Sequence, residues 1–338
     1  MPTYRESRAL SPPLPEPRGA VSASVRTALG EGTAVALPPE SPAGADPFGD
    51  DLQLALYVLY ELHYQGFDGV DDRREWDPEL LRVRRVLEDR FLGAVREAVP
   101  GGGGADDALA GLLVEPVGDD GTSTTHFLDR EGTREQLREY AALRSLYHLK
   151  EGDPHAWVLP RLHGRAKAGM VAVEYDEYGA GRAEDLHARL FADLMADLEL
   201  DVRYGHYVDV APAQALAVVN LMSALGLQRA LRGALVGHFA AVEVTSSPGS
   251  RRLAHAMRRT GAGAAAERFY AEHVEADAVH EQVVRREVVA GLLADEPHLE
   301  PDVAFGVRAT VLVEDRLAAH LLDAWRAGRS ALRAPLLP

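Results

Sequence analysis

The chain has 338 residues, 46% of them hydrophobic, which is enough to bury a sizeable core as one large domain or two small ones. The 52 acidic residues outnumber the 36 basic ones, and the net charge of −16 argues against a nucleic-acid-binding surface. The absence of cysteine excludes disulfides, thiolate metal sites and a cysteine nucleophile. No apolar run reaches the roughly 18 residues of a membrane-spanning helix, and no secretory signal is apparent, so we expect a cytoplasmic protein without a membrane partner.

The first segment, residues 1–48, contains nine prolines and no sustained periodicity. We predict a flexible or loosely packed tail, part of which can lie along the domain. Helical periodicity then predicts an all-α domain over residues 49–330, because period-2 alternation is nearly absent. In chain order, the expected helices cover 51–64, 79–99, 133–149, 157–178, 183–198, 212–225, 229–245, 250–260, 264–293 and 303–329.

The expected helix at 264–293 carries polar side chains within its apolar face. The stripe that includes Tyr270 and Val284 is filled in its middle by His273, Asp277 and His280. At about 100° per residue, these three side chains point within roughly 60° of one another. Burying an aspartate between two histidines is costly unless something compensates, and a divalent ion of iron, manganese or zinc does so. The alternative is a solvated polar face, because the helix also carries several glutamates.

Two glutamates stand alone in apolar surroundings. Glu61 is the only acid of residues 54–62, where it is either protonated and hydrogen-bonded or serves a cation. Glu243 is the only acid among the 57 residues between Asp209 and Glu267, where the average composition corresponds to about nine. The small and apolar residues around Glu243 predict that it points into a bundle interior. A surface position near a helix end is the alternative.

A further acid and histidine flank a glycine-containing segment, residues 178–182. A straight helix would leave the side chains of Glu177 and His187 about 80° apart, whereas a segment loosened by glycine can bring both to one centre. Glu174 and Glu184 are rivals of Glu177, and Glu184 forms with His187 the Glu-x-x-His spacing that shares one helical face. A solvated, charged turn is the alternative to any ligand role here.

The phrases DEYGAG…H, RGALVGHFAAVE and FYAEHVEADAVH resemble those of the heme-oxygenase-like di-iron oxidases and oxygenases, often called iron-containing redox enzymes. The resemblance covers about residues 50–325 and implies an up-down bundle of about seven core helices. It favours Glu177 over Glu184. The stretch 66–155 is longer than expected in compact members, and such an insertion leaves Glu151 and Glu139 as alternatives to Glu61 for the first ligand. The ligands that the resemblance implies are Glu61, Glu177, His187, Glu243, His273, Asp277 and His280.

The same resemblance implies the cofactors and the reaction class. Two metal ions per chain, Fe(II)/Fe(III) or with manganese in one position, would activate dioxygen as co-substrate. A small-molecule substrate would undergo N-oxygenation, C–H oxidation or C–C cleavage. The four carboxylates of the ligand set neutralise two Fe(II) ions, which makes a buried cluster electrostatically tolerable. An external electron donor and a homodimer are compatible partners.

Two other functions also fit a bundle of this kind. One is a metal-independent protein that binds or cleaves a small molecule, in which the inward acids and histidines act as general acids, bases or ligand contacts. The other is a non-catalytic iron-handling protein.

Overall fold

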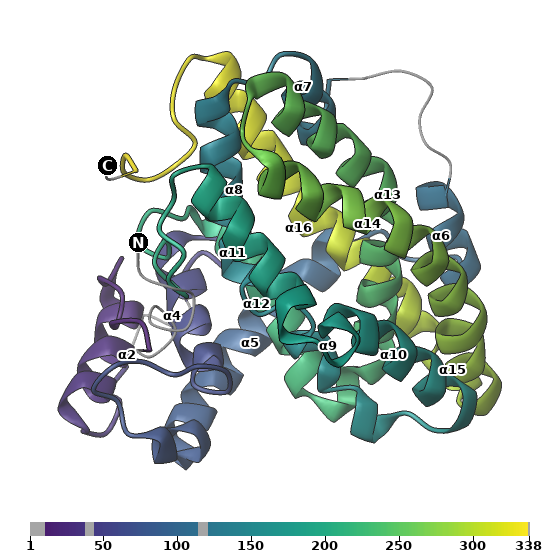
Figure 1. The fold of residues 1–338 in the computed structure, drawn as a ribbon. Helices are drawn as coiled ribbons and strands as arrows, with labels where there is room; N and C mark the ends of the chain where they lie inside the picture. The colour runs from purple at the N-terminus through teal and green to yellow at the C-terminus, as the bar shows by residue number, and fades with distance from the viewer. Residues whose placement is uncertain (1–10, 38–43, 114–120, 337–338) are drawn as a thin grey trace.

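The computed structural model describes residues 11–37, 44–113 and 121–336, except for the side chains of residues 275, 277 and 278. These residues form helices joined by turns and contain no β-strand, which confirms the predicted all-α architecture (Figure 1). No helix in the described ranges is both long and apolar enough to cross a bilayer.

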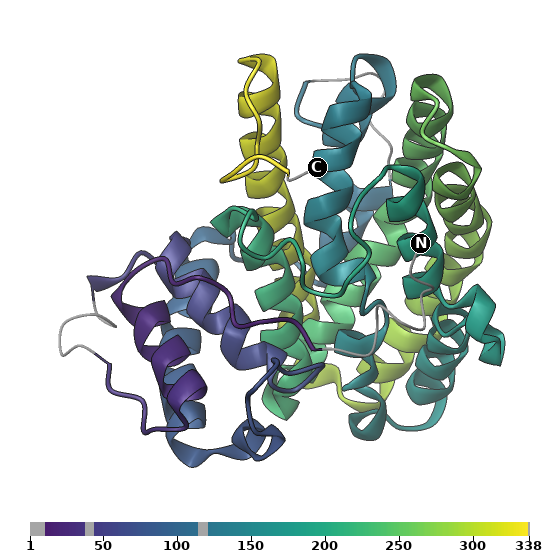
Figure 2. The ribbon, with the colours of Figure 1, turned by 60° about the vertical axis from the view of Figure 1, so that its left-hand side comes forward.

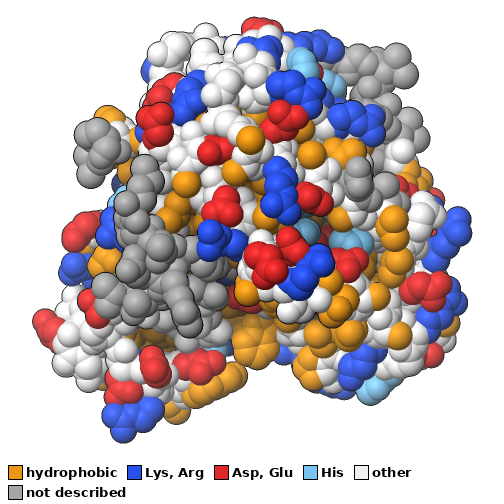
Figure 3. Space-filling view, viewed as in Figure 1, with side chains coloured by type: hydrophobic (Ala, Val, Ile, Leu, Met, Phe, Trp, Pro, Cys, Tyr) orange, Lys and Arg blue, Asp and Glu red, His pale blue; other side chains and the backbone are white. Residues whose placement is uncertain are grey.

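The first helices form a group beside the main bundle, as Figure 2 shows. They are α2 (Ala20–Glu31), α4 (Asp50–Glu61), the short η1 (Asp72–Trp76) and α5 (Pro78–Ala98). Nearly every residue of α4 is buried, as its apolar composition predicts. The space-filling view of Figure 3 shows a hollow between this group and the rest of the molecule, with hydrophobic side chains inside it.

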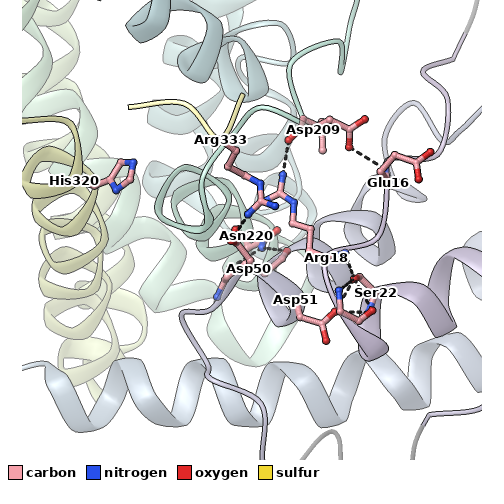
Figure 4. A network of polar contacts seen from close by, with 12 residues as sticks. Glu16, Arg18, Ser22, Asp50, Asp51, Asp209, Asn220, His320 and Arg333 are labelled. Carbon is pink, nitrogen blue, oxygen red and sulfur yellow. Dashed lines mark hydrogen bonds and ion pairs between the residues drawn. The ribbon is translucent and has the colours of Figure 1, made fainter. Parts of the chain in front are cut away.

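Part of the proline-rich N-terminal segment is fixed to the domain by polar contacts (Figure 4). The Asp51 carboxylate accepts hydrogen bonds at the N-terminus of α2, including one of 2.7 Å from the backbone N–H of Ser22. The Arg18 guanidinium lies 3.1 Å from Asp50 Oδ1 and donates a second hydrogen bond to the carbonyl of Val208. Residues 11–37 therefore lie along the domain, while residues 1–10 and 38–43 are outside the described ranges.

The main bundle follows. Its helices are α6 (Ala105–Leu113), α7 (Thr124–Arg130), α8 (Arg134–His148), α9 (Asp153–Ala156), α10 (Gly164–Glu177), α11 (His187–Asp197), α12 (Ala213–Leu227), α13 (Arg232–Thr260), α14 (Ala264–Val283), α15 (Ala290–Asp295) and α16 (Glu300–Arg326). Almost all of α12 is buried, because it contains mainly Ala, Val, Leu and Met and has no polar face to turn outward. The long α13 packs along both α14 and α16.

Glycines allow α13 and α16 to touch backbone to backbone. A Cβ atom on Gly237 would lie 2.0 Å from the carbonyl oxygen of Val303, and one on Gly306 would lie 1.9 Å from that of Ala234. Neither contact can be relieved by turning a side chain, because the opposing atoms belong to the backbone. Small residues therefore set the depth at which α13 lies in the bundle.

Two predicted helices differ from the observed ones, and one predicted interruption is confirmed. The predicted helices 229–245 and 250–260 form one helix, α13, which continues through Pro248 because its packing on α14 and α16 outweighs the lost backbone hydrogen bond. The predicted helix 264–293 is divided by a π-helical turn at Val284–Val289. The expected interruption near residue 179 is confirmed: residues 179–181 all have positive φ, so α10 ends at Glu177 and α11 begins at His187.

Candidate metal centre

Six ionisable side chains converge in the bundle interior as two neighbouring groups. Each group places three potential metal-ligand atoms within 4.8 Å of one another, and all six residues are buried. The first group consists of Glu151, His187 and His273, and the second of Glu177, Glu243 and His280. Glu151 lies in the turn after α8, and Glu177 and His187 flank the interruption at residues 178–186. Glu243 lies on α13, and His273 and His280 lie on α14.

Glu177 connects the two groups. One of its carboxylate oxygens, Oε2, lies 2.8 Å from Nδ1 of His187 in the first group. The other, Oε1, lies 3.8 Å from Nδ1 of His280 in the second group. A carboxylate that presents one oxygen to each group can bridge two metal ions. The interruption after α10 produces this arrangement, because it lets the last residue of one helix face the first residue of the next.

The histidines are held in fixed orientations by neighbouring acceptors. Nδ1 of His273 must be the protonated nitrogen, since it donates a 2.7 Å hydrogen bond to the carbonyl of Phe269 one turn earlier. Its Nε2 is buried and makes no hydrogen bond to any described residue. Nε2 of His280 lies 3.2 Å from Asp176, which leaves its Nδ1 facing Glu243 Oε2 at 3.3 Å. Such outer partners typically fix the tautomer of metal-binding histidines.

Glu151 is positioned in a similar way by its own outer partner. Its Oε1 accepts a 2.7 Å hydrogen bond from Nδ1 of His148, the last residue of α8, while its Oε2 lies 3.9 Å from Nε2 of His273. Burial lowers the pKa of His148 to about 3, so the ring is neutral and its Nδ1 proton is the one shared with Glu151. Helical periodicity carries no signal for His148 or for Asp176, because each contacts a residue outside its own helix: Glu151 in the turn after α8, and His280 on α14.

The electrostatics of the six side chains favour bound cations. Burial alone would raise the pKa of Glu177, but the adjacent His187, together with His273 and His280, outweighs this and holds the pKa below its usual range. Burial and the surrounding glutamates raise the pKa of Tyr147, which lies beside the same acids. Metal ions would supply the positive charge that stabilises these closely spaced, buried carboxylates.

The structure does not bring Glu61 into either group. Its side chain is fully buried, and Oε2 forms a 2.8 Å ion pair with Nζ of Lys150 while Oε1 accepts a 2.5 Å hydrogen bond from Tyr204. The cation that Glu61 serves is therefore a lysine. Glu139, one of the two alternatives for this ligand, accepts hydrogen bonds from the indole of Trp325 and from a backbone N–H. The other alternative, Glu151, belongs to the first of the two groups.

Among the described side chains, none of the remaining candidate ligands belongs to either group of converging side chains. Asp277 lies on α14 between His273 and His280 in the sequence, but its side chain is outside the described part of the structure. Glu184 is exposed on the short turn η4 (Ala183–Asp185) and belongs to neither group. Glu174 is buried next to the two groups without being a member of either.

Comparison with known proteins agrees with this geometry. A family model described as iron-containing redox enzyme, of the heme-oxygenase-like class, matches residues 138–315, and the chain belongs to this family. No curated protein matches the chain. The match contains all six converging residues and excludes Glu61. It begins within α8, so the turn that carries Glu151 lies inside the match and α4 lies outside it.

The donor set fits iron. Carboxylates and imidazoles without thiolates suit iron or manganese and disfavour softer metals. The buried Nε2 of His273, which makes no hydrogen bond within the described residues, is a ligand atom for which a metal ion would supply a partner. Together with the family assignment, these residues define a buried carboxylate–histidine centre in an iron-containing redox protein.

Proposed function

We propose that the protein is a non-heme di-iron oxidase or oxygenase that uses dioxygen to oxidise a small molecule. The observation that carries this proposal is the pair of adjacent buried groups, joined by one glutamate that faces both. We assign the first metal position to Glu151, His187 and His273, and the second to Glu177, Glu243 and His280. Asp277 remains the predicted seventh ligand.

The bound metal ions would supply the electrons and the open coordination positions that dioxygen reduction requires. The side chains of the protein hold the two ions and keep the ligand atoms in position. Glu177 and Glu243 hold negative charge in a dry interior, which stabilises two divalent ions close together. His148 and Asp176 orient a carboxylate and an imidazole through hydrogen bonds, which keeps the ligand atoms in place while the substrate enters.

The interruption at residues 178–186 supports a site that assembles on metal binding. Glu177 and His187 lie at its two edges, and the backbone between them has three consecutive positive φ angles and short 3-10 turns in place of a continuous α-helix. A ligand-bearing segment without helical support gains order when the metal binds. The pairing of iron with iron or with manganese, an external electron donor and a homodimer remain predictions.

Anaerobic titration with Fe(II), followed by exposure to air, tests the proposal. We expect two Fe(II) ions per chain, oxygen consumption and a transient visible absorption band. Accumulation of iron well beyond two per chain would instead indicate an iron-handling protein, and a chain that binds no iron would refute the proposal.

Matched variants locate the site. His280→Ala and Glu243→Ala should abolish iron binding at one or both positions while the helical circular dichroism stays unchanged. Glu177→Gln should reduce iron binding, whereas Glu184→Gln, which removes the same charge from an exposed position, should bind two ions. Normal iron binding by both His280→Ala and Glu243→Ala would overturn the ligand assignment.

A further inference from the structure

Two of the segments that carry proposed metal ligands lie outside the long helices. Glu151 lies in the turn at residues 149–153, between α8 and α9. Glu177 is the last residue of α10, and His187 follows the interruption at residues 178–186. Glu151 and His187 belong to the same group of ligand atoms. The first metal position therefore depends on how the turn and the interruption are held relative to each other.

A side-chain hydrogen bond joins these two segments. The hydroxyl of Tyr178, the first residue after α10, donates to Asp153 Oδ1 over 3.0 Å. Asp153 begins α9 and lies two positions after Glu151, while Tyr178 directly follows Glu177. The hydrogen bond therefore connects close chain neighbours of two proposed ligands across a sequence separation of 25 residues.

The backbone of the turn packs tightly at the same place. Gly152 has a φ of +89°, and a Cβ atom built there would lie 3.1 Å from Cζ of Tyr178 and 3.0 Å from Oε2 of Glu174. Both distances are shorter than ordinary van der Waals contacts. The turn thus lies directly against the end of α10, and its position is coupled to that of the Tyr178 ring.

The interruption has little regular structure of its own to fix its position. Residues 179–181 all have positive φ, and the short 3-10 turns η3 (Gly179–Gly181) and η4 replace a continuous helix. Single turns are unfavourable by themselves, so such a segment is held mainly by contacts with its neighbours. The contact of Tyr178 lies at the first residue of this segment, where it can fix the path of the chain toward His187.

We propose that Tyr178 and Asp153 are positioning residues for the first metal position. Their hydrogen bond holds the turn that carries Glu151 against the end of α10 and against the segment that leads to His187. The inference rests on the proposed function, because it assumes that Glu151 and His187 bind one metal ion together. Residues outside the ligand set that fix the spacing of ligand atoms typically strengthen metal binding.

The variant Tyr178→Phe removes the hydrogen bond and keeps the ring. In an anaerobic calorimetric titration of the full chain with Fe(II), we expect one of the two ions to bind about three- to tenfold more weakly, as the loss of one ordinary hydrogen bond predicts. The affinity of the other ion should not change. Two unchanged affinities in Tyr178→Phe would overturn the inference.

Tyr64→Phe is the matched control. Tyr64 and Tyr178 line the same surface cleft of about 350 Å³, together with Trp157. The Tyr64 hydroxyl donates a 3.1 Å hydrogen bond to Ser223 on α12, a helix that carries no proposed ligand. Its removal should leave both iron affinities unchanged. An equal loss in Tyr64→Phe and Tyr178→Phe would show a general effect of the cleft and would contradict the positioning role.

Variants of the acceptor test whether the two residues act together. Asp153→Ala should weaken the same ion, whereas Asp153→Asn keeps an acceptor oxygen for Tyr178 and should retain most of the affinity. Adding Tyr178→Phe to Asp153→Ala should cause no further loss, because the hydrogen bond is already absent. Adding it to Glu151→Gln should not affect the remaining ion, because Tyr178 acts through the first position. Additive losses in both double variants would refute the assignment.

Hydrogen exchange in the metal-free protein separates this inference from the proposed function. Tyr178→Phe should accelerate amide exchange in peptides that cover residues 149–156 and 178–186, and Tyr64→Phe should not. A chain that binds two Fe(II) ions, with unchanged affinities and unchanged exchange in Tyr178→Phe, would refute the positioning role alone. A chain that binds no iron but exchanges faster in Tyr178→Phe would refute the di-iron function and support the connection between the two segments.

Discussion

The buried ion pair between Glu61 and Lys150 provides a direct test of which glutamate is the first metal ligand. Lys150 and Glu151 are adjacent in the chain, yet the lysine contacts Glu61 and the glutamate contacts His148 and lies near His273. Glu61→Gln should therefore bind iron normally, whereas Glu151→Gln should lose iron from one of the two positions. The two variants remove the same charge from two buried side chains.

Substitution of Lys150 tests the same geometry through its effect on the stability of the folded state. Lys150 is 3% exposed, and Lys150→Met leaves the Glu61 carboxylate buried without a counter-ion, with hydrogen bonds that include those from Tyr204 and the backbone N–H of Gln65. Breaking a buried pair from one side costs about 3–5 kcal/mol. An unfolding entropy of about 2.1 cal/mol/K per residue gives ~0.7 kcal/mol per kelvin for the whole chain. The melting temperature should thus fall by about 4–7 °C.

The double variant Glu61→Gln/Lys150→Met completes the cycle. It leaves neither charge behind and should recover most of the lost stability, because replacement of a whole buried pair by neutral groups is often close to neutral. Urea unfolding of the metal-free variants, with iron stoichiometry measured separately, provides both readouts. A loss of less than ~1 kcal/mol in Lys150→Met, or loss of iron in Glu61→Gln, would refute the reasoning.

Two further predictions concern packing and pH. Gly306→Ala places a methyl group against the carbonyl of Ala234 and should destabilise the protein by about 1–3 kcal/mol or more, measured by urea unfolding, with Gly93→Ala as a control at an open helical position in α5. Burial lowers the pKa of His155 to about 4, below the unfolded value of about 6.5. The unfolded state therefore takes up the His155 proton between about pH 6.5 and 4 while the folded state does not. The contribution of His155 to the free energy of unfolding should fall by about 1.4 kcal/mol per pH unit as the pH drops through this range. His155→Gln should show a correspondingly shallower decline, and an unchanged slope would argue against a buried neutral His155.

Much of the candidate centre could be inferred from local patterns. Helical periodicity places His273 and His280 on one face of α14, and the isolation of Glu243 in an acid-poor window marks it as inward-facing. The glycines beside Glu177 indicate the interruption that brings it to His187. Each of these signals lies within one helix or one turn, where sequence spacing determines direction.

The choice between Glu61 and Glu151 required the tertiary structure. Glu61 ends α4 and Glu151 follows the end of α8, and their local sequences do not show which one faces a histidine and which one faces a lysine. That difference depends on the turn at residues 149–153, which directs two adjacent side chains to opposite partners. The surface cleft lined by Tyr64, Trp157 and Tyr178 could not be inferred from the sequence either, because its walls come from segments about 90 residues apart in the chain. The sequence alone determined most of the long helices and most of the inward-facing acids and histidines, because both follow from local spacing. It did not predict α2, α6, α7 or α9, and only packing decided which buried charges face one another.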